Sequence, residues 1–61
     1  MKLYDIIQAH PNSYVVMIPH ERDERDFVAS WAVLNQASVL SEAEDLRKIY
    51  ESEGMADVVI Y

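Results

Sequence analysis

Cysteine is absent from this sequence, and only one glycine and two prolines occur among its 61 residues. Without cysteine the chain can form no disulfide, no thiolate zinc site and no thiol nucleophile. A single glycine offers no glycine-rich turn of the kind that cradles phosphate groups. These absences exclude several common classes of functional site, and the lack of cysteine predicts a cytoplasmic, reducing environment.

Long apolar runs and positive charge are also scarce. The longest apolar run covers residues 14–18, whereas a membrane-spanning helix needs about 20 such residues. Eleven carboxylates against five Lys and Arg side chains give a formal net charge of -6. Such a chain repels nucleic acid and anionic lipid and favours a basic protein surface. We therefore expect no membrane association and no direct nucleic-acid binding.

Apolar side chains are plentiful, because 51% of the residues are hydrophobic. This composition is typical of a packed domain, and the length allows a single domain over residues 1–61. A chain this short buries only about 60% of the surface that its unfolded form exposes. Domains below about 70 residues usually need a disulfide, a metal or a partner chain. Since no disulfide can form, we expect a partner chain to stabilise the fold.

Residue patterns predict the elements of the first half. Apolar spacing favours a short helix that ends near His10, because the residue before Pro11 is biased away from helical geometry. Residues 14–18 are aromatic or β-branched at nearly every position, which predicts a buried strand that ends at Pro19. The charged residues 20–26 predict a solvated loop or the exposed start of a helix.

Residues 27–37 fit two templates. Apolar alternation at Phe27, Ala29, Trp31 and Val33 is typical of a strand, but Phe27, Trp31 and Leu34 also share one helical face. We favour the strand, because without it the sheet would have two strands and marginal stability. The helical alternative predicts two strands covered by three helices.

The second half contains a helix and a strand. Ser41 and Glu44 have the spacing of a capping box, which predicts a helix that starts at Glu42. Gly54 provides a left-handed residue to close the helix, and residues 57–61 are predicted to form a last strand. The apolar stripe of the helix consists of Ala43, Leu46, Ile49 and Tyr50.

The predicted order is helix, strand, strand, helix, strand. It indicates a small two-layer α+β domain with a three-stranded, mainly antiparallel sheet and the first strand at its centre. Both faces of this sheet would be apolar, and the short first helix cannot cover its face completely. We therefore expect a homodimer or a higher symmetric oligomer. Its candidate contact residues are Trp31, Val59 and Tyr61.

No residue pattern indicates catalysis. His10 and His20 are the only imidazoles, and their spacing matches no metal motif. The serines have structural interpretations in turns, strands and caps, and the carboxylates near Glu42 stabilise the positive end of a helix. We therefore expect no metal, no cofactor and no enzymatic activity.

The acidic loop supports a binding function. Carboxylates presented where a nucleic-acid-binding protein expects phosphates would make the chain a non-catalytic inhibitor or regulator with a basic target. In size, charge and element order the chain resembles small phage-encoded inhibitors, including one group of uracil-DNA glycosylase inhibitors; this resemblance implies an inhibitory role and transfers no residue. The candidate contact residues are Glu21, Asp23, Glu24 and Asp26.

A structural or assembly role is the alternative. Arg22, Arg25, Arg47 and Lys48 are interleaved with the carboxylates, a pattern typical of an ordinary solvated face. In this alternative the chain is a homo-oligomer, its apolar surfaces serve self-association, and its acidity only keeps it in solution.

Overall fold

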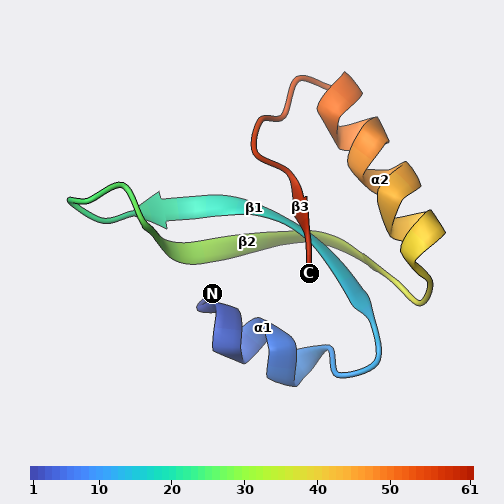
Figure 1. The fold of residues 1–61 in the computed structure, drawn as a ribbon, viewed down its shortest axis with the longest axis horizontal. Coiled ribbons are helices and arrows are strands. Elements are labelled where there is room, and N and C mark those ends of the chain that lie inside the picture. Colours follow the sequence, from blue (N-terminus) through green and yellow to red (C-terminus); the bar gives the residue numbers. More distant parts are fainter.

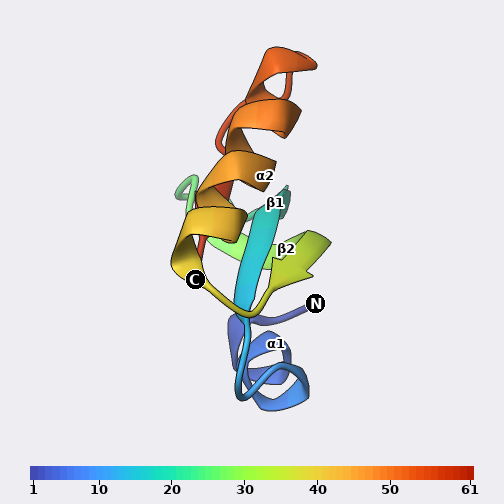
Figure 2. The same cartoon turned by 90° about the vertical axis from the view of Figure 1, so that its right-hand side faces the viewer.

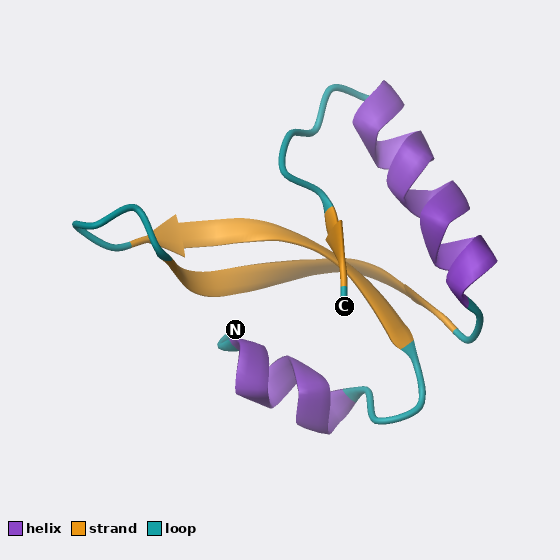
Figure 3. Cartoon of the chain, viewed as in Figure 1, coloured by secondary structure: helices purple, strands orange, loops and turns teal.

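Two helices and three strands form the computed structural model, which describes residues 1–61 (Figures 1 and 3). The predicted α+β class and element order are confirmed, and residues 27–37 contain a strand and no helix. The elements are α1 (Leu3–Ala9), β1 (Tyr14–Arg22), β2 (Val28–Ala37), α2 (Leu40–Ser52) and β3 (Val59–Ile60).

The sheet has the strand order β2-β1-β3, and both neighbouring pairs are antiparallel. The prediction of β1 as the central strand is confirmed. Its consecutive residues Val15, Val16 and Met17 are all buried, because both faces of the sheet are covered at this point. β3 is shorter than the predicted 57–61, since Asp57 has a φ of 59°, outside the strand region.

One helix packs on each face of the sheet (Figures 1 and 2). α1 inserts Ile6 against Val15 and Met17, and this packing adds a third layer to the predicted two. On the opposite face, α2 contributes Ala43 to the second core cluster. The other buried members of that cluster are Val16, Ala37 and Val58.

The β1–β2 hairpin extends beyond the rest of the sheet (Figure 1). The prediction that β1 ends at Pro19 is wrong, because the strand continues to Arg22. β3 pairs only with Val16 and Met17, so Pro19 lies where β1 has lost its second neighbour. The β1–β2 register also shifts just after Pro19. A proline is tolerated at such an irregular, two-stranded position because little hydrogen bonding is lost there.

The start of α2 differs from the sequence prediction. The helix begins at Leu40, its N-cap residue Val39 makes no side-chain cap hydrogen bond, and Ser41 lies inside the first turn. The predicted capping box is therefore wrong. The Ala43 amide donates to the Val39 carbonyl (3.2 Å), and the Ala43 side chain is fully buried. The helix thus begins with a backbone hydrogen bond to Val39, two residues before the predicted cap Ser41.

The other features of α2 agree in part with the prediction. Leu46 and Tyr50 pack against the core, but Ile49, which was predicted to belong to the apolar stripe, is 53% exposed and does not pack there. Gly54 has a φ of 92° and follows the helix end, as predicted. Neither α1 nor α2 combines the length and apolar character that a bilayer-crossing helix requires.

The molecule is flat, with principal extents of 34 × 28 × 12 Å. Only seven of its residues are buried, while ten large hydrophobic side chains are exposed. Figure 1 looks down the 12 Å axis and shows α1 and α2 on either side of the strands, so the layers are narrow and cover little of one another. Much apolar surface therefore remains in contact with water.

Candidate protein-binding surface

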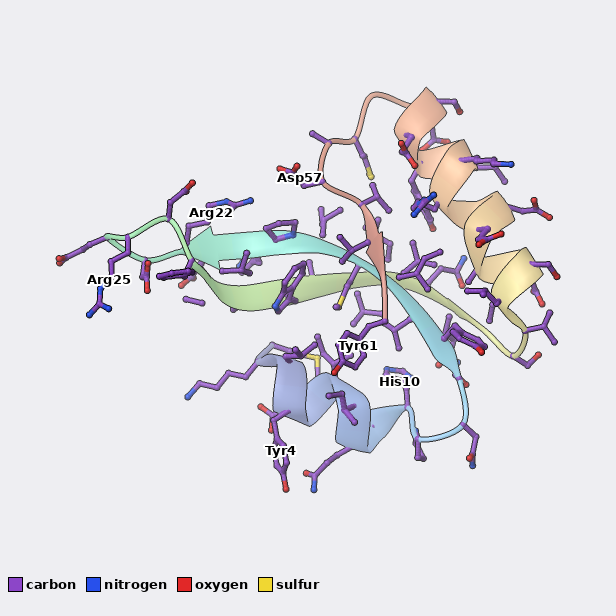
Figure 4. The ribbon with its side chains drawn as sticks, viewed as in Figure 1. Tyr4, His10, Arg22, Arg25, Asp57 and Tyr61 are labelled. Atoms are coloured by element: carbon purple, nitrogen blue, oxygen red, sulfur yellow. The ribbon has the colours of Figure 1, made fainter.

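The four predicted acidic contact residues lie together at the far end of the β1–β2 hairpin. Glu21 belongs to the end of β1, and all four side chains are exposed. The predicted loop over residues 20–26 is too long, because residues 20–22 extend β1 and the connection covers residues 23–27. We call residues 21–27 the hairpin tip. Figure 4 shows it far from both helices, with Arg25 labelled at its end.

The conformation of the hairpin tip is fixed by Asp23. Its carboxylate Oδ1 accepts hydrogen bonds from the amides of Arg25 (2.9 Å) and Phe27 (3.0 Å). The Asp26 amide donates to the Asp23 carbonyl (3.0 Å), and Asp26 has a φ of 67°. The Asp23 amide donates to the Phe27 carbonyl (2.9 Å), which leaves residues 24–26 as the loop within the connection. A turn followed by a left-handed residue is a common form of such a three-residue loop, and Asp tolerates that conformation better than most residues. The carboxylates are therefore presented by an ordered loop.

Arg22 is turned back toward the molecule. Its Nη1 donates to the Asp26 carbonyl (3.0 Å), its Nε lies 3.7 Å from Asp26 Oδ1, and its Nη2 lies 3.5 Å from Asp57 Oδ2. Figure 4 shows Arg22 and Asp57 on the same side of the hairpin. Arg25, in contrast, forms no salt bridge. Arg22 therefore offers little positive charge to a partner.

Trp31, Val59 and Tyr61 lie on the α1 side of the sheet. Val59 pairs with Met17, whereas Trp31 pairs with Pro19 and directly follows Ser30, the partner of Glu21 in the hairpin tip. Trp31 and Val59 are partly buried and pack against the core cluster of Ile6, Val15 and Met17. Tyr61 is 56% exposed, and Figure 4 shows it between the end of β3 and α1. The structure thus separates the predicted contact residues into two groups, one acidic and one largely apolar.

Three exposed aromatic residues were not among the predicted contact residues: Phe27, Tyr4 and, at 39% exposed, Tyr14. Phe27 adjoins the acidic loop and is 66% exposed, and Tyr4 on α1 is 68% exposed. Phe27 was interpreted as part of an apolar strand face, although it directly follows a run of six charged residues. That position next to the charged run was the only sequence signal for its exposure.

The surface has two hollows with different chemistry. One, of about 260 Å³, is lined by Asp23, Glu24 and Arg25 at the hairpin tip. The other, of about 180 Å³, lies beside α1 and has His10 and Ser13 in its lining. No hydrogen bond joins these two side chains, and His10 Nδ1 pairs instead with Gln36 Oε1. Nowhere do three or more His, Asp or Glu side chains converge in a way that could hold a metal ion.

Replacing Asp23 by alanine is expected to destabilise the hairpin tip, because two amide donors lose their acceptor. We expect a decrease of about 1–2 kcal/mol in the free energy of unfolding. Asp23→Asn keeps the Oδ1 acceptor and should leave stability nearly unchanged. Urea unfolding of both variants measures the difference, and an equal loss in both would contradict the hydrogen-bonding role.

The hairpin tip combines four exposed carboxylates, one unpaired guanidinium and one exposed aromatic ring on an ordered loop. The side-chain hydrogen bonds of the hairpin tip all have a backbone atom as partner, and no cluster of metal ligands lies there. Comparison of the chain with protein-family models, with curated proteins and with solved structures gives no match.

Proposed function

We propose that this chain is a non-catalytic protein-binding module, a small inhibitor or regulator whose hairpin tip contacts a basic surface on another protein. The observation that supports it is the projection of an ordered acidic loop beyond both helices (Figure 1). Four carboxylates against two guanidiniums give the tip a negative charge, and Arg22 is held inward by Asp26 and Asp57. Negative potential at a projecting site steers a basic partner toward it.

Phe27 gives the same surface an apolar contact. Exposed aromatic rings act as anchors in interfaces because they bury a large area at a low cost in conformational entropy. The Asp23 hydrogen bonds hold the neighbouring backbone before binding, so less freedom is lost when a partner docks. Charge therefore guides association, and Phe27 adds contact area.

Neutralising the hairpin tip should abolish partner capture. The test variant carries Glu21→Gln, Asp23→Asn, Glu24→Gln and Asp26→Asn. The Asp23→Asn change retains an acceptor for the loop amides, and asparagine tolerates the positive φ at position 26, so we expect thermal unfolding to change little. With wild-type chain as bait at low salt, a native-host extract should yield a specific protein that the variant does not retain.

A matched control separates the hairpin tip from total charge. Glu42→Gln, Glu44→Gln, Asp45→Asn and Glu53→Gln remove the same charge from exposed positions on or directly after α2. These carboxylates form no salt bridge in the structure, so their loss should leave the fold intact. Capture should persist with this control. Equal loss with both variants would show that only total charge matters and would contradict a contact at the tip.

A structural role as a homodimer or higher oligomer is the second candidate. It is favoured by the small number of buried residues, seven, against ten exposed large hydrophobic side chains. In that role the carboxylates provide solubility and contact no target. Ionic strength separates the two roles, because salt weakens charge contacts and leaves apolar association unchanged or stronger.

A further inference from the structure

The hairpin tip has one side-chain connection to a distant part of the molecule. β3 pairs with only two residues of β1, so the outer part of the hairpin is a ribbon of two strands. Such a ribbon is marginally stable by itself and twists more than a larger sheet. Apart from strand pairing and contacts between chain neighbours, a single ion pair joins residues 21–27 to another segment. It is formed by Arg22 and Asp57.

Asp57 lies at the point where β3 leaves the sheet. β3 pairs Val59 with Met17 in an antiparallel register, which brings Asp57 opposite Pro19. Pro19 has no amide hydrogen to donate, and Asp57 has a left-handed φ of 59°, so strand pairing does not continue here. Arg22 extends back to this place, with 3.5 Å between its Nη2 and Asp57 Oδ2 (Figure 4). The ion pair therefore forms where β1 loses its third-strand neighbour.

One guanidinium contacts both left-handed aspartates of the chain. Asp26 and Asp57 are the only residues other than glycine with a positive φ, at 67° and 59°. Arg22 Nη1 donates to the Asp26 carbonyl (3.0 Å), and Nε lies 3.7 Å from the Asp26 carboxylate. A single exposed ion pair is weak because two flexible side chains lose freedom to form it. Here one long side chain loses its freedom once for three contacts, which favours the bridged arrangement.

We propose that Arg22 is a positioning residue for the acidic contact surface. By joining Asp26 to Asp57, it connects the hairpin tip to the segment before β3 and fixes the direction in which the tip carboxylates point. This inference rests on the proposed binding function, because the direction of the tip matters only to a partner that docks there. A tip that is held in one direction before docking loses less freedom on binding.

Charge and positioning make opposite predictions for Arg22. Arg22→Gln removes a positive charge beside the tip, so charge attraction alone would tighten the binding of a basic partner. Loss of a positioning residue weakens binding instead, although the tip becomes more negative. For the protein that wild-type chain captures from a native-host extract, we expect Kd to rise about fivefold, the equivalent of a strong exposed ion pair.

Residual dipolar couplings, measured by NMR on the free chain, test the positioning without any partner. In wild type, the amide couplings of residues 21–27 should fit the same molecular alignment as those of α2. In Arg22→Gln and Asp57→Asn they should be smaller than that alignment requires, because the hairpin tip then changes direction in solution. Asparagine tolerates the left-handed conformation at position 57, and exposed ion pairs add little to global stability, so urea unfolding should change little.

Arg47→Gln is the matched control. It removes the same charge and breaks the pair of Arg47 with Glu51 on α2 (3.2 Å). The side chain of Arg47 is 42% exposed, close to the 39% of Arg22. Because Arg47 does not contact the hairpin tip, the tip couplings should stay at their wild-type values, and Kd should not rise.

The outcomes separate this inference from the proposed function. Reduced tip couplings and a higher Kd in Arg22→Gln, with neither change in Arg47→Gln, would support the positioning role. Tip couplings of Arg22→Gln that still fit the α2 alignment would overturn it, and so would a Kd at or below that of wild type. A host extract that yields no specific protein would contradict the proposed function, even where the couplings show that Arg22 fixes the direction of the tip.

Discussion

Replacing Ile6 by alanine is expected to lower the free energy of unfolding by about 2–5 kcal/mol, the usual range for truncating a fully buried Ile. Ile6 is the only buried residue of α1, has no exposed surface, and forms one core cluster with Val15 and Met17. Folded domains have total stabilities of about 5–15 kcal/mol, and small ones lie near the lower limit. We therefore expect α1 to detach from the sheet or the whole chain to unfold.

The fluorescence of Trp31 reports whether α1 stays packed on the sheet. Trp31 is the only tryptophan and packs at the same cluster, so loss of α1 should expose its indole and shift its fluorescence to longer wavelength. Urea titration followed by this signal gives the change in stability. Ile7→Ala is the control, because Ile7 is 40% exposed and should cost much less. Equal losses at Ile6 and Ile7 would contradict the packing of α1 described here.

Introducing a carboxylate at Ala43 should have a comparable or larger effect. Ala43 is fully buried where α2 packs on the sheet, among Val16, Ala37 and Val58. The side chains of this cluster are all hydrophobic, and Arg47, one helical turn further along α2, is already paired with Glu51 (Nε to Oε1, 3.2 Å). A buried charge without a free partner costs several kcal/mol. We expect Ala43→Asp to lose the helical circular dichroism signal and the cooperative unfolding transition.

The same substitution at Ala56 is the control. Ala56 is exposed in the segment between α2 and β3, so Ala56→Asp should fold with nearly the wild-type unfolding midpoint. Should Ala43→Asp unfold with the same midpoint as Ala56→Asp, the assignment of Ala43 to the core between α2 and the sheet would be wrong.

Local patterns in the sequence were sufficient for every element except residues 27–37. The run at residues 14–18 identified the central strand because β-branched residues in succession suit a strand covered on both faces. Residues 27–37 required an argument about the whole sheet, since their apolar spacing fits a helix as well. Gly54 was predictable because a left-handed residue at a helix end is usually glycine.

Element boundaries depended on contacts between distant residues. The capping-box pattern at Ser41 and Glu44 is local and did not predict the start of α2, where the Ala43 amide donates to the Val39 carbonyl instead. Pro19 ends a strand only where each backbone amide must be paired, and at this point β1 has lost β3 as a neighbour. A local residue pattern carries no information about such tertiary contacts.

The charge of the candidate surface was predictable from the sequence, but the ordered conformation of its loop was not. Side chains at Glu21, Asp23, Glu24 and Asp26 were expected to be solvated, and they are exposed. The hydrogen bonds of Asp23 and the pairing of Arg22 with Asp57 arise from a specific turn and a long-range contact. The exposure of Phe27 was likewise missed, because its alternation with Ala29, Trp31 and Val33 placed it on an apolar strand face.

The salt dependence of partner binding tests the proposed function most directly. The partner captured by wild-type chain is purified, and its Kd is measured at increasing salt for wild type, the neutralised-tip variant and the α2 control. We predict that log Kd rises steeply with log salt for wild type and the α2 control. The neutralised-tip variant should bind weakly at low salt and show a much shallower slope. A slope that the neutralised-tip variant shares with wild type, or an affinity independent of salt, would contradict the acidic hairpin tip as the contact surface.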